Sequence, residues 1–232
     1  MDNQNWYCNP QWVAIFVTIF SVLFLGFIAI FQNWIRSWFY KPKLKIEFEL
    51  KSPYCHSVPT QREYNRYYFR FKVENEGNHQ MEDVEVMAVE LKKKRSDGRF
   101  EKEEQFLPLN LAWAHYRNPI NPNLLMETMP KIQPKLHKFC SLGFIEESKH
   151  LEKSKFKIRE SSNNVVFMLD TVIKPYSGEQ ILFPNYHYKI TLKIAANNLK
   201  PQQKTFKLFF RDEWIDDKEE IMFKKNVIIE DS

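Results

Sequence analysis

The chain has 232 residues, of which 44% are hydrophobic and 27% are charged, and its formal net charge is +5 at pH 7. This length suits one membrane anchor and one globular domain. The 5 glycines lie too far apart to form a Gly-x-Gly-x-x-Gly loop, a P-loop or a nucleophile elbow. The 6 histidines form no His-Glu-x-x-His pair, and the 3 cysteines form no Cys-x-x-Cys pair. We therefore expect a protein that is not an enzyme, without catalytic, cofactor-binding or metal-binding residues.

An apolar segment near the N-terminus predicts a transmembrane helix. Residues 12–31 are apolar except for Thr18, Ser21 and Gly26, and the chain carries no charge between Asn3 and Ile35. Twenty helical residues rise about 30 Å, the thickness of the hydrocarbon core. Since no Lys or Arg precedes the segment and no small-residue cleavage site follows it, a retained helix at 12–35 is favoured over a signal peptide or a buried helix.

The flanks of this helix predict its orientation. The tail of residues 1–11 carries only Asp2, whereas Arg36, Lys41 and Lys43 lie in the basic, aromatic segment 36–43. The positive-inside rule then places the N-terminus outside and the C-terminal part in the cytoplasm, at the inner or plasma membrane. Tryptophan and basic side chains favour the headgroup layer. We expect lipid headgroup contacts from Trp34, Arg36, Trp38, Lys41 and Lys43.

Residues 44–232 show the pattern of an antiparallel β-sandwich, and the predicted fold class is mainly β. Apolar residues alternate with polar ones, the period of a half-buried strand, at 43–50, 67–73, 188–194 and 206–210. Further strands are expected at 84–91, 100–106, 107–113, 136–145, 165–169 and 179–183. Around Ala88 the apolar phase changes, which indicates a bulge or a strand buried on both faces. No segment shows ten residues of helical periodicity, so a parallel sheet is not expected.

Two stretches interrupt the strand pattern. Residues 115–134 are rich in Pro and Asn, and residues 146–164 are highly charged. We expect both to be long loops, where binding surfaces are often found. Near 215–225 acidic residues precede basic ones, an order that suits a short helix.

One motif resembles a known family. The stretch Phe71-Lys72-Val73-Glu74-Asn75-Glu76-Gly77, followed by Asp83-Val84-Glu85-Val86, resembles the V-x-N-x-G…V-x-V signature of CARDB-like and related immunoglobulin-like sandwich domains. Physically, a strand would end at Val73, Asn75 would close an Asx turn and Gly77 would supply a positive φ. The resemblance implies a binding or scaffolding module, and the overall plan is similar to uncharacterised prokaryotic single-pass membrane proteins.

Four groups of residues have both a functional and a structural interpretation. Cys55, His56, His137 and Cys140 could bind zinc or be ordinary strand residues. Lys92–Arg95, with Tyr64, Tyr67 and Tyr68, could bind nucleic acid or form a solvated hairpin end. Asp212, Glu213, Asp216 and Asp217 could hold a divalent cation or lie at a helix N-terminus. Trp113 and Trp214 could be ligand platforms or packing residues. We favour the structural interpretation in each case.

The sequence therefore predicts a cytoplasmic, non-enzymatic interaction or scaffold module. Its partners would be the lipid bilayer and a membrane-proximal protein, with no cofactor and no nucleic acid. Two alternatives are a membrane-tethered nucleic-acid-binding protein and, if the topology is reversed, an extracytoplasmic adhesion module. A hydrolase would require a pocket in which acidic side chains and a histidine converge.

Overall fold

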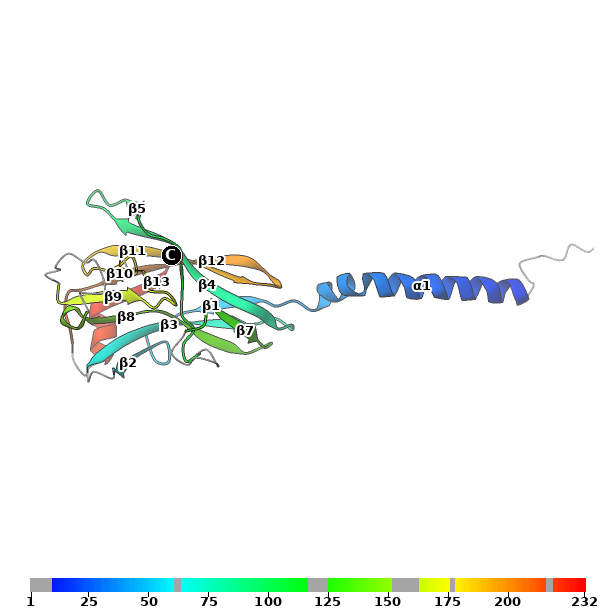
Figure 1. The fold of residues 1–232 in the computed structure, drawn as a ribbon, viewed down its shortest axis with the longest axis horizontal. Coiled ribbons are helices and arrows are strands. Elements are labelled where there is room, and N and C mark those ends of the chain that lie inside the picture. The colour runs from blue at the N-terminus through cyan, green and yellow to red at the C-terminus, as the bar shows by residue number, and fades with distance from the viewer. Residues whose placement is uncertain (1–9, 61–63, 117–124, 152–162, 176–177, 216–218) are drawn as a thin grey trace, which may run out of the picture. The chain divides into compact units, whose positions relative to one another are not determined.

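A computed structural model describes residues 10–60, 64–116, 125–151, 163–175, 178–215 and 219–232 (Figure 1). Within the helix, the side chains of residue 33 and residues 35–39 lie outside this description. The chain divides into two compact units, the first ending at Lys41 and the second beginning at Pro42.

The described part of the first unit, from residue 10 onward, forms the helix α1 (Pro10–Phe39). Its segment Pro10–Gln32, of 23 residues, is long and apolar enough to cross a membrane, and 0% of it is buried within the protein. The hydroxyls of Thr18 and Ser21 donate to the carbonyls of Ala14 and Val17, at 2.8 and 2.7 Å. Polar groups inside the apolar segment are therefore satisfied by the helix itself. The helix covers the predicted span 12–35 and continues to Phe39, so the first half of the segment 36–43 is helical.

The second unit is a sandwich of two antiparallel sheets, which confirms the mainly-β prediction. Sheet A has the order β1-β3-β8-β9-β10, with β2 also paired to β3. Its strands are β1 (Leu44–Glu47), β2 (Cys55–Pro59), β3 (Asn65–Asn75), β8 (His137–Glu147), β9 (Val165–Leu169) and β10 (Ile181–Leu182). Sheet B has the order β13-β12-β11-β4-β5, with β6 and β7 also paired to β4. Its strands are β4 (Met81–Lys94), β5 (Phe100–Lys102), β6 (Leu109–Asn110), β7 (Thr128–Ile132), β11 (His187–Ala196), β12 (Leu199–Phe210) and β13 (Val227–Asp231).

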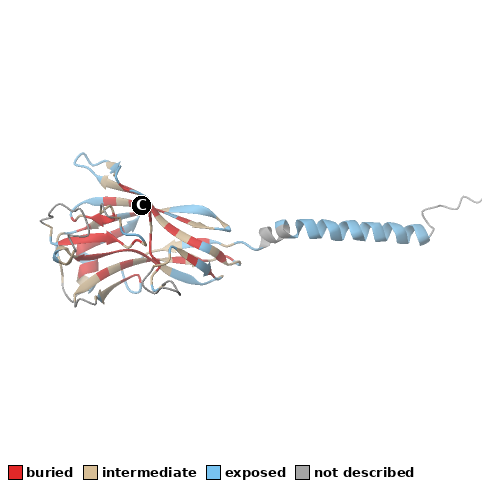
Figure 2. Cartoon of the chain, viewed as in Figure 1, coloured by how far each residue is buried: buried red, intermediate tan, exposed pale blue. Residues whose placement is uncertain are grey.

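The core lies between the two sheets and follows from the alternation of their strands. On β3 every second residue from Tyr67 to Val73 is fully buried, and the residues between them are only partly buried (Figure 2). The ring of Phe71 in sheet A packs 6.0 Å from the ring of Phe206 in sheet B. Each such aromatic side chain contributes roughly 1.5–3 kcal/mol through burial of apolar surface.

The register shifts three times within the sheets, and at two of these places one strand has an extra residue that changes the direction of its side chains. Thr191 pairs with Glu90 and Leu192 pairs with Ala88, so Val89 is an extra residue in β4. Of the two interpretations of the phase change near Ala88, a bulge or a strand buried on both faces, the structure shows the bulge. On β8, the partners of Phe69 and Arg70 are Gly143 and Ser141, so Leu142 is extra.

The chain crosses from sheet B to sheet A directly after β6. Leu111 and Trp113 form bridges to Thr171 and Cys140, and the amide of Ser141 donates to the carbonyl of Ala112 at 2.9 Å. The predicted strand 107–113 is therefore divided between the two sheets.

Other predictions need correction. Part of the expected loop 115–134 is strand β7, and the first two residues of the expected loop 146–164 belong to β8, followed by a 3₁₀ turn at Ser148–His150. The strands expected at 43–50, 100–106 and 179–183 are shorter than predicted. Strands β2 and β13 were not predicted. The short helix expected near 215–225 is present as α2 (Glu219–Ile221) and a π-helical turn, Met222–Asn226.

Candidate functional site

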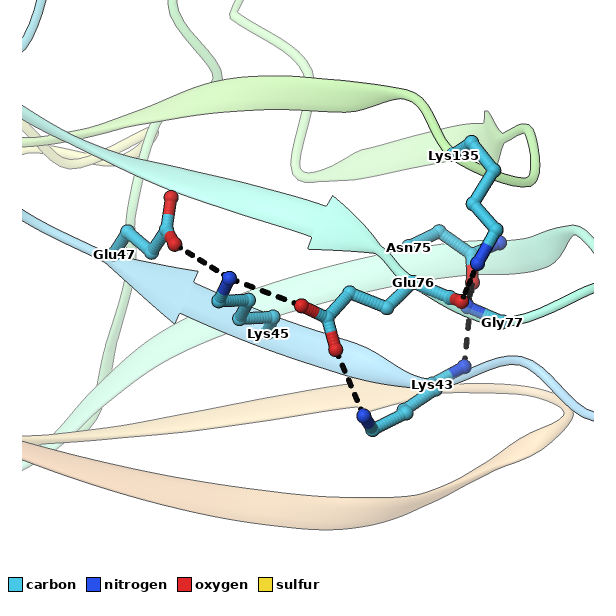
Figure 3. Close-up of polar contacts among 7 residues, drawn as sticks. All are labelled: Lys43, Lys45, Glu47, Asn75, Glu76, Gly77 and Lys135. Atoms are coloured by element: carbon cyan, nitrogen blue, oxygen red, sulfur yellow. Dashed lines mark hydrogen bonds and ion pairs between the residues drawn. The ribbon is translucent and has the colours of Figure 1, made fainter.

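The N-terminal end of the sandwich is fixed by a polar group that we call the Asn75 cluster: Lys43, Lys45, Glu47, Asn75, Glu76, Gly77 and Lys135 (Figure 3). Asn75 is the last residue of β3 and is fully buried. Its Oδ1 accepts hydrogen bonds from the amides of Lys43 (3.2 Å) and Gly77 (3.0 Å). Its Nδ2 donates to the carbonyls of His79 (2.6 Å) and Ile132 (3.1 Å). The amide group thus uses both donors and both acceptor positions.

Backbone bonds join the same segments. The amide of Glu76 donates to the carbonyl of Lys43 at 2.8 Å, and the amide of Lys135 donates to the carbonyl of Asn75 at 2.7 Å. The Lys135 ammonium also donates to the carbonyl of Glu76. These bonds therefore hold three segments together: the residue preceding β1, the end of β3 and the turn before β8.

The Asn75 cluster also contains a run of ion pairs. A carboxylate oxygen of Glu76 lies 2.8 Å from the Lys43 ammonium, and the other lies 3.0 Å from that of Lys45. Lys45 also contacts Glu47 at 2.7 Å. Hydrogen bonds from Lys43 and Lys45 lower the pKa of Glu76 to about 2, and the two carboxylates raise the pKa of Lys45.

The Asx turn predicted at Asn75 is present, in the bond from Gly77 to Asn75. Two details of that prediction are wrong. Strand β3 continues to Asn75 instead of ending at Val73. Among the described glycines, those with positive φ are Gly98 and Gly178, so Gly77 does not supply this conformation.

The five predicted headgroup residues have different surroundings. Trp34 is exposed and lies edge-on to Phe31, and Lys41 is exposed. Lys43 is exposed, but its ammonium pairs with Glu76 within the sandwich. The side chains of Arg36 and Trp38 lie outside the described residues. Because Lys43 already pairs with Glu76, a lipid phosphate would have to compete with that carboxylate for the Lys43 ammonium.

The zinc candidates are separate strand residues. Cys55 and Cys140 are buried, and their thiols donate to the carbonyls of Glu49 and Ala112, each at 3.5 Å. His56 stacks on Tyr68, and His137 lies against Phe139. Burial raises the pKa of the Cys55 thiol to about 12 and also raises that of Cys140. Within the described residues, no group of three His, Cys, Asp or Glu side chains could hold a metal ion.

In the basic run Lys92–Arg95, two residues form ion pairs with glutamates and a third lies over an aromatic ring. Lys92 pairs with Glu90 at 2.9 Å. Arg95 contacts Glu101 at 2.9 Å and Glu103 at 3.3 Å. The Lys93 ammonium lies 3.3 Å from the centre of the Tyr186 ring, and burial lowers its pKa. These contacts fit the interpretation as a hairpin end.

The three tyrosines proposed to stack bases do not form a common platform. Tyr67 is fully buried, and its hydroxyl donates to the carbonyl of Ile215. Tyr64 stacks on His150 with 3.9 Å between ring centres, whereas Tyr68 packs against His56 and Phe144.

The remaining candidates have structural contacts. Asp212 Oδ1 accepts the amides of Asn164 (2.6 Å) and Val165 (3.1 Å), so it fixes the start of β9. The Glu213 carbonyl accepts a bond from Asn226 at 3.1 Å. Asp216 and Asp217 lie outside the described residues. Trp113 is buried in the core, and Trp214 packs 5.0 Å from the ring of Tyr67, as expected for packing residues.

A cavity of about 400 Å³ was missed by sequence reasoning. It lies on the outer face of sheet A, and we call it the outer cavity. It is lined by Val58, Arg66, Tyr68, Arg70, Ala112, Trp113, Ala114, His115, Leu125, Ser141, Phe144, Asp170 and Lys174. The residues come from strands and connections far apart in the chain, so no motif marks them. One signal was available: Arg66, Tyr68 and Arg70 alternate along β3 and therefore share a face.

Comparison with known protein families, curated proteins and solved structures finds no match to this chain.

Proposed function

We propose that this chain is a single-pass membrane protein with a cytoplasmic, immunoglobulin-like β-sandwich that acts as a non-enzymatic interaction or scaffold module. Its partner would be a membrane-proximal protein. The observation that carries the proposal is the Asn75 cluster, which fixes the chain at Lys43, only a few residues beyond a helix long enough to cross a membrane.

In this proposal, the short connection between α1 and the sandwich limits how far the sandwich can move from the bilayer. Helix α1 ends at Phe39, and only Tyr40, Lys41 and Pro42 separate it from Lys43. At about 3.6 Å per residue, this connection extends roughly 15 Å at most. A module attached in this way would stay beside the bilayer, where a scaffold for membrane proteins acts.

The contacts of the sandwich argue against two other functions, nucleic-acid binding at the basic hairpin and thiol catalysis. The basic run at the β4–β5 hairpin is engaged by glutamates and by Tyr186, which argues against a phosphate-binding surface there. Both described cysteines are buried, and burial raises the pKa of each thiol, which argues against a thiolate nucleophile.

The topology is tested by cysteine labelling in intact cells. Cys55 and Cys140 are buried and would be unreactive on either side of the membrane, so an exposed reporter is needed. Arg99, whose side chain is 86% exposed, is a suitable position for Arg99→Cys. An impermeant maleimide should label Cys8 in intact cells and label Arg99→Cys only after permeabilisation. The reverse pattern would overturn the cytoplasmic placement and favour the adhesion module.

The interaction role is tested by photo-crosslinking of the full chain in native membranes. A crosslinking amino acid would replace Leu136, which is 56% exposed and lies next to the Asn75 cluster, or Ile228 on the edge strand β13. A discrete protein adduct at one of these positions would support the proposal. Adducts that are lost on nuclease treatment would favour the nucleic-acid-binding alternative, and the lack of any adduct at both positions would count against a scaffold.

A further inference from the structure

The outer cavity has a floor built by two neighbouring strands. On β3, Tyr68 pairs with Phe144, and Arg70 pairs with Ser141. The Leu142 bulge between these pairs lets Leu142 enter the core while Ser141 and Phe144 line the cavity. The bulge therefore places a guanidinium and a hydroxyl-bearing residue side by side at a concave site.

The two arginines of the floor differ in their partners. Arg66 Nε donates to Glu146 Oε2 at 2.7 Å, and its guanidinium lies 4.4 Å from the centre of the Phe144 ring. The Glu146 side chain is only 2% exposed, so this pair is matched within the protein. Arg70 has a different environment: its Nη1 lies 2.9 Å from His115 Nε2, and its buried Nε has no hydrogen-bond partner.

The contact with His115 restricts the protonation state of that ring. Because a guanidinium can only donate, Nε2 must accept, and the neutral ring then carries its proton on Nδ1. His115 has a φ of 58°, in the left-handed region that non-glycine residues seldom adopt. Such residues are held in place by their surroundings and cluster at binding sites.

The charges around the outer cavity leave a cationic excess. Arg66 is balanced by Glu146, so the remaining charged lining residues are Arg70, Lys174 and Asp170. Burial lowers the pKa of Arg70, and the nearby Asp170 and Tyr68 act in the opposite direction. The volume lies within the roughly 300–1,000 Å³ of small-molecule sites, and aromatic and aliphatic side chains form part of the wall.

We propose that the outer cavity binds a small organic oxyanion, a carboxylate or a phosphate ester, with Arg70 as its principal contact. A guanidinium suits this role because its N–H groups match two oxygens of one anion. Lys174, an exposed residue at the same cavity, supplies the second positive charge. Asp170 and the apolar wall then select among ligands by the organic group to which the anion is attached. This binding site does not depend on the membrane topology or on the scaffold role.

The proposal is tested with four probes that share one aromatic ring: phenyl phosphate, benzoate, phenol and benzylamine. Each is titrated by calorimetry into the full-length protein in detergent, with detergent blanks. We expect at least one anion to bind and both phenol and benzylamine to remain at the blank level. The variant Arg70→Gln should weaken anion binding at least tenfold. Arg99→Gln, which removes the same charge from the exposed hairpin, should bind as the wild type does.

Further variants keep the test decisive if Arg70→Gln fails to fold. Arg70→Lys keeps the charge but loses the planar fork and should weaken binding severalfold, and Lys174→Gln should weaken it at an exposed position. The proposal is overturned if neither anion binds the wild type, if phenol binds as well as the anions, or if the folded Arg70 and Lys174 variants all retain wild-type affinity. A preference between phenyl phosphate and benzoate would identify which oxyanion the cavity takes.

Discussion

Replacing Asn75 with alanine should destabilise the sandwich strongly. The substitution removes four side-chain hydrogen bonds at a fully buried position. Two of them, to Gly77 and Ile132, are buried, and two, to Lys43 and His79, are partly buried. At about 1–1.5 kcal/mol for each buried bond and about 0.5 kcal/mol for each of the others, the loss is roughly 3 kcal/mol. This is a large share of the 5–15 kcal/mol typical of a folded domain.

The matched control is Asn198→Ala. Asn198 also makes two hydrogen bonds, to the Gln80 carbonyl and from the Glu82 amide, but it is exposed. Its loss should cost less than about 1 kcal/mol, because water replaces the missing partners. Urea unfolding of the full-length protein in detergent, followed by circular dichroism of the β-structure, measures both variants. If Asn75→Ala costs no more than Asn198→Ala, the reasoning about the Asn75 cluster is wrong.

Three further predictions concern stability and reactivity. Gly143→Ala should destabilise the sandwich by about 1–3 kcal/mol in the same unfolding assay, because an added Cβ would overlap a backbone carbonyl oxygen and an aromatic ring of β9; unchanged stability would contradict this. The pKa of Glu76 is about 2, below the ordinary 4.5, so its ion pairs stabilise the fold above pH 4.5 and lose this effect as the pH falls towards 2. Unfolding curves measured over a pH series should therefore show a smaller change of the unfolding free energy in this window for Glu76→Gln than for the wild type. An equal change in both proteins would refute the role of these ion pairs. With Cys8→Ser, no thiol should react with a disulfide reagent at pH 8 before denaturant is added, since Cys55 and Cys140 are buried and the pKa of Cys55 is about 12; fast labelling of the folded protein would show that one of them is accessible.

The strands that the sequence predicted well are those with neighbours on both sides. β3 and β11 lie inside their sheets and bury alternate residues, so their period-2 pattern is strong. β2, β7 and β13 each pair with only one strand in the described structure, and their short sequences bury few side chains. In β7 even a proline is tolerated, since Pro130 faces no register partner. These three edge strands therefore carried too little apolar pattern to be found, whereas β1, also at an edge, follows the alternation at 43–50.

In the candidate sites, the contacts that the sequence predicted are local, and those that it missed join residues far apart in the chain. The bond from Gly77 to Asn75 was predictable because an Asx turn is local in sequence. Two other partners of Asn75, Lys43 and Ile132, lie 32 and 57 residues away, and only the fold reveals them. The outer cavity was hidden for the same reason, since His115 and Lys174 reach it from connections between strands. Sequence patterns describe one strand at a time, whereas a binding site depends on how strands meet.

The Asn75 cluster also determines how the sandwich would respond to a pulling force on the chain before Pro42. β1 is a four-residue strand at the edge of sheet A and, alone, would peel away one bond at a time. Because Lys43 is bonded to both Asn75 and Glu76, the load passes at once to β3, which is paired along its length with β8. The bonds at Lys43 must therefore break before β1 can peel from the edge of the sheet.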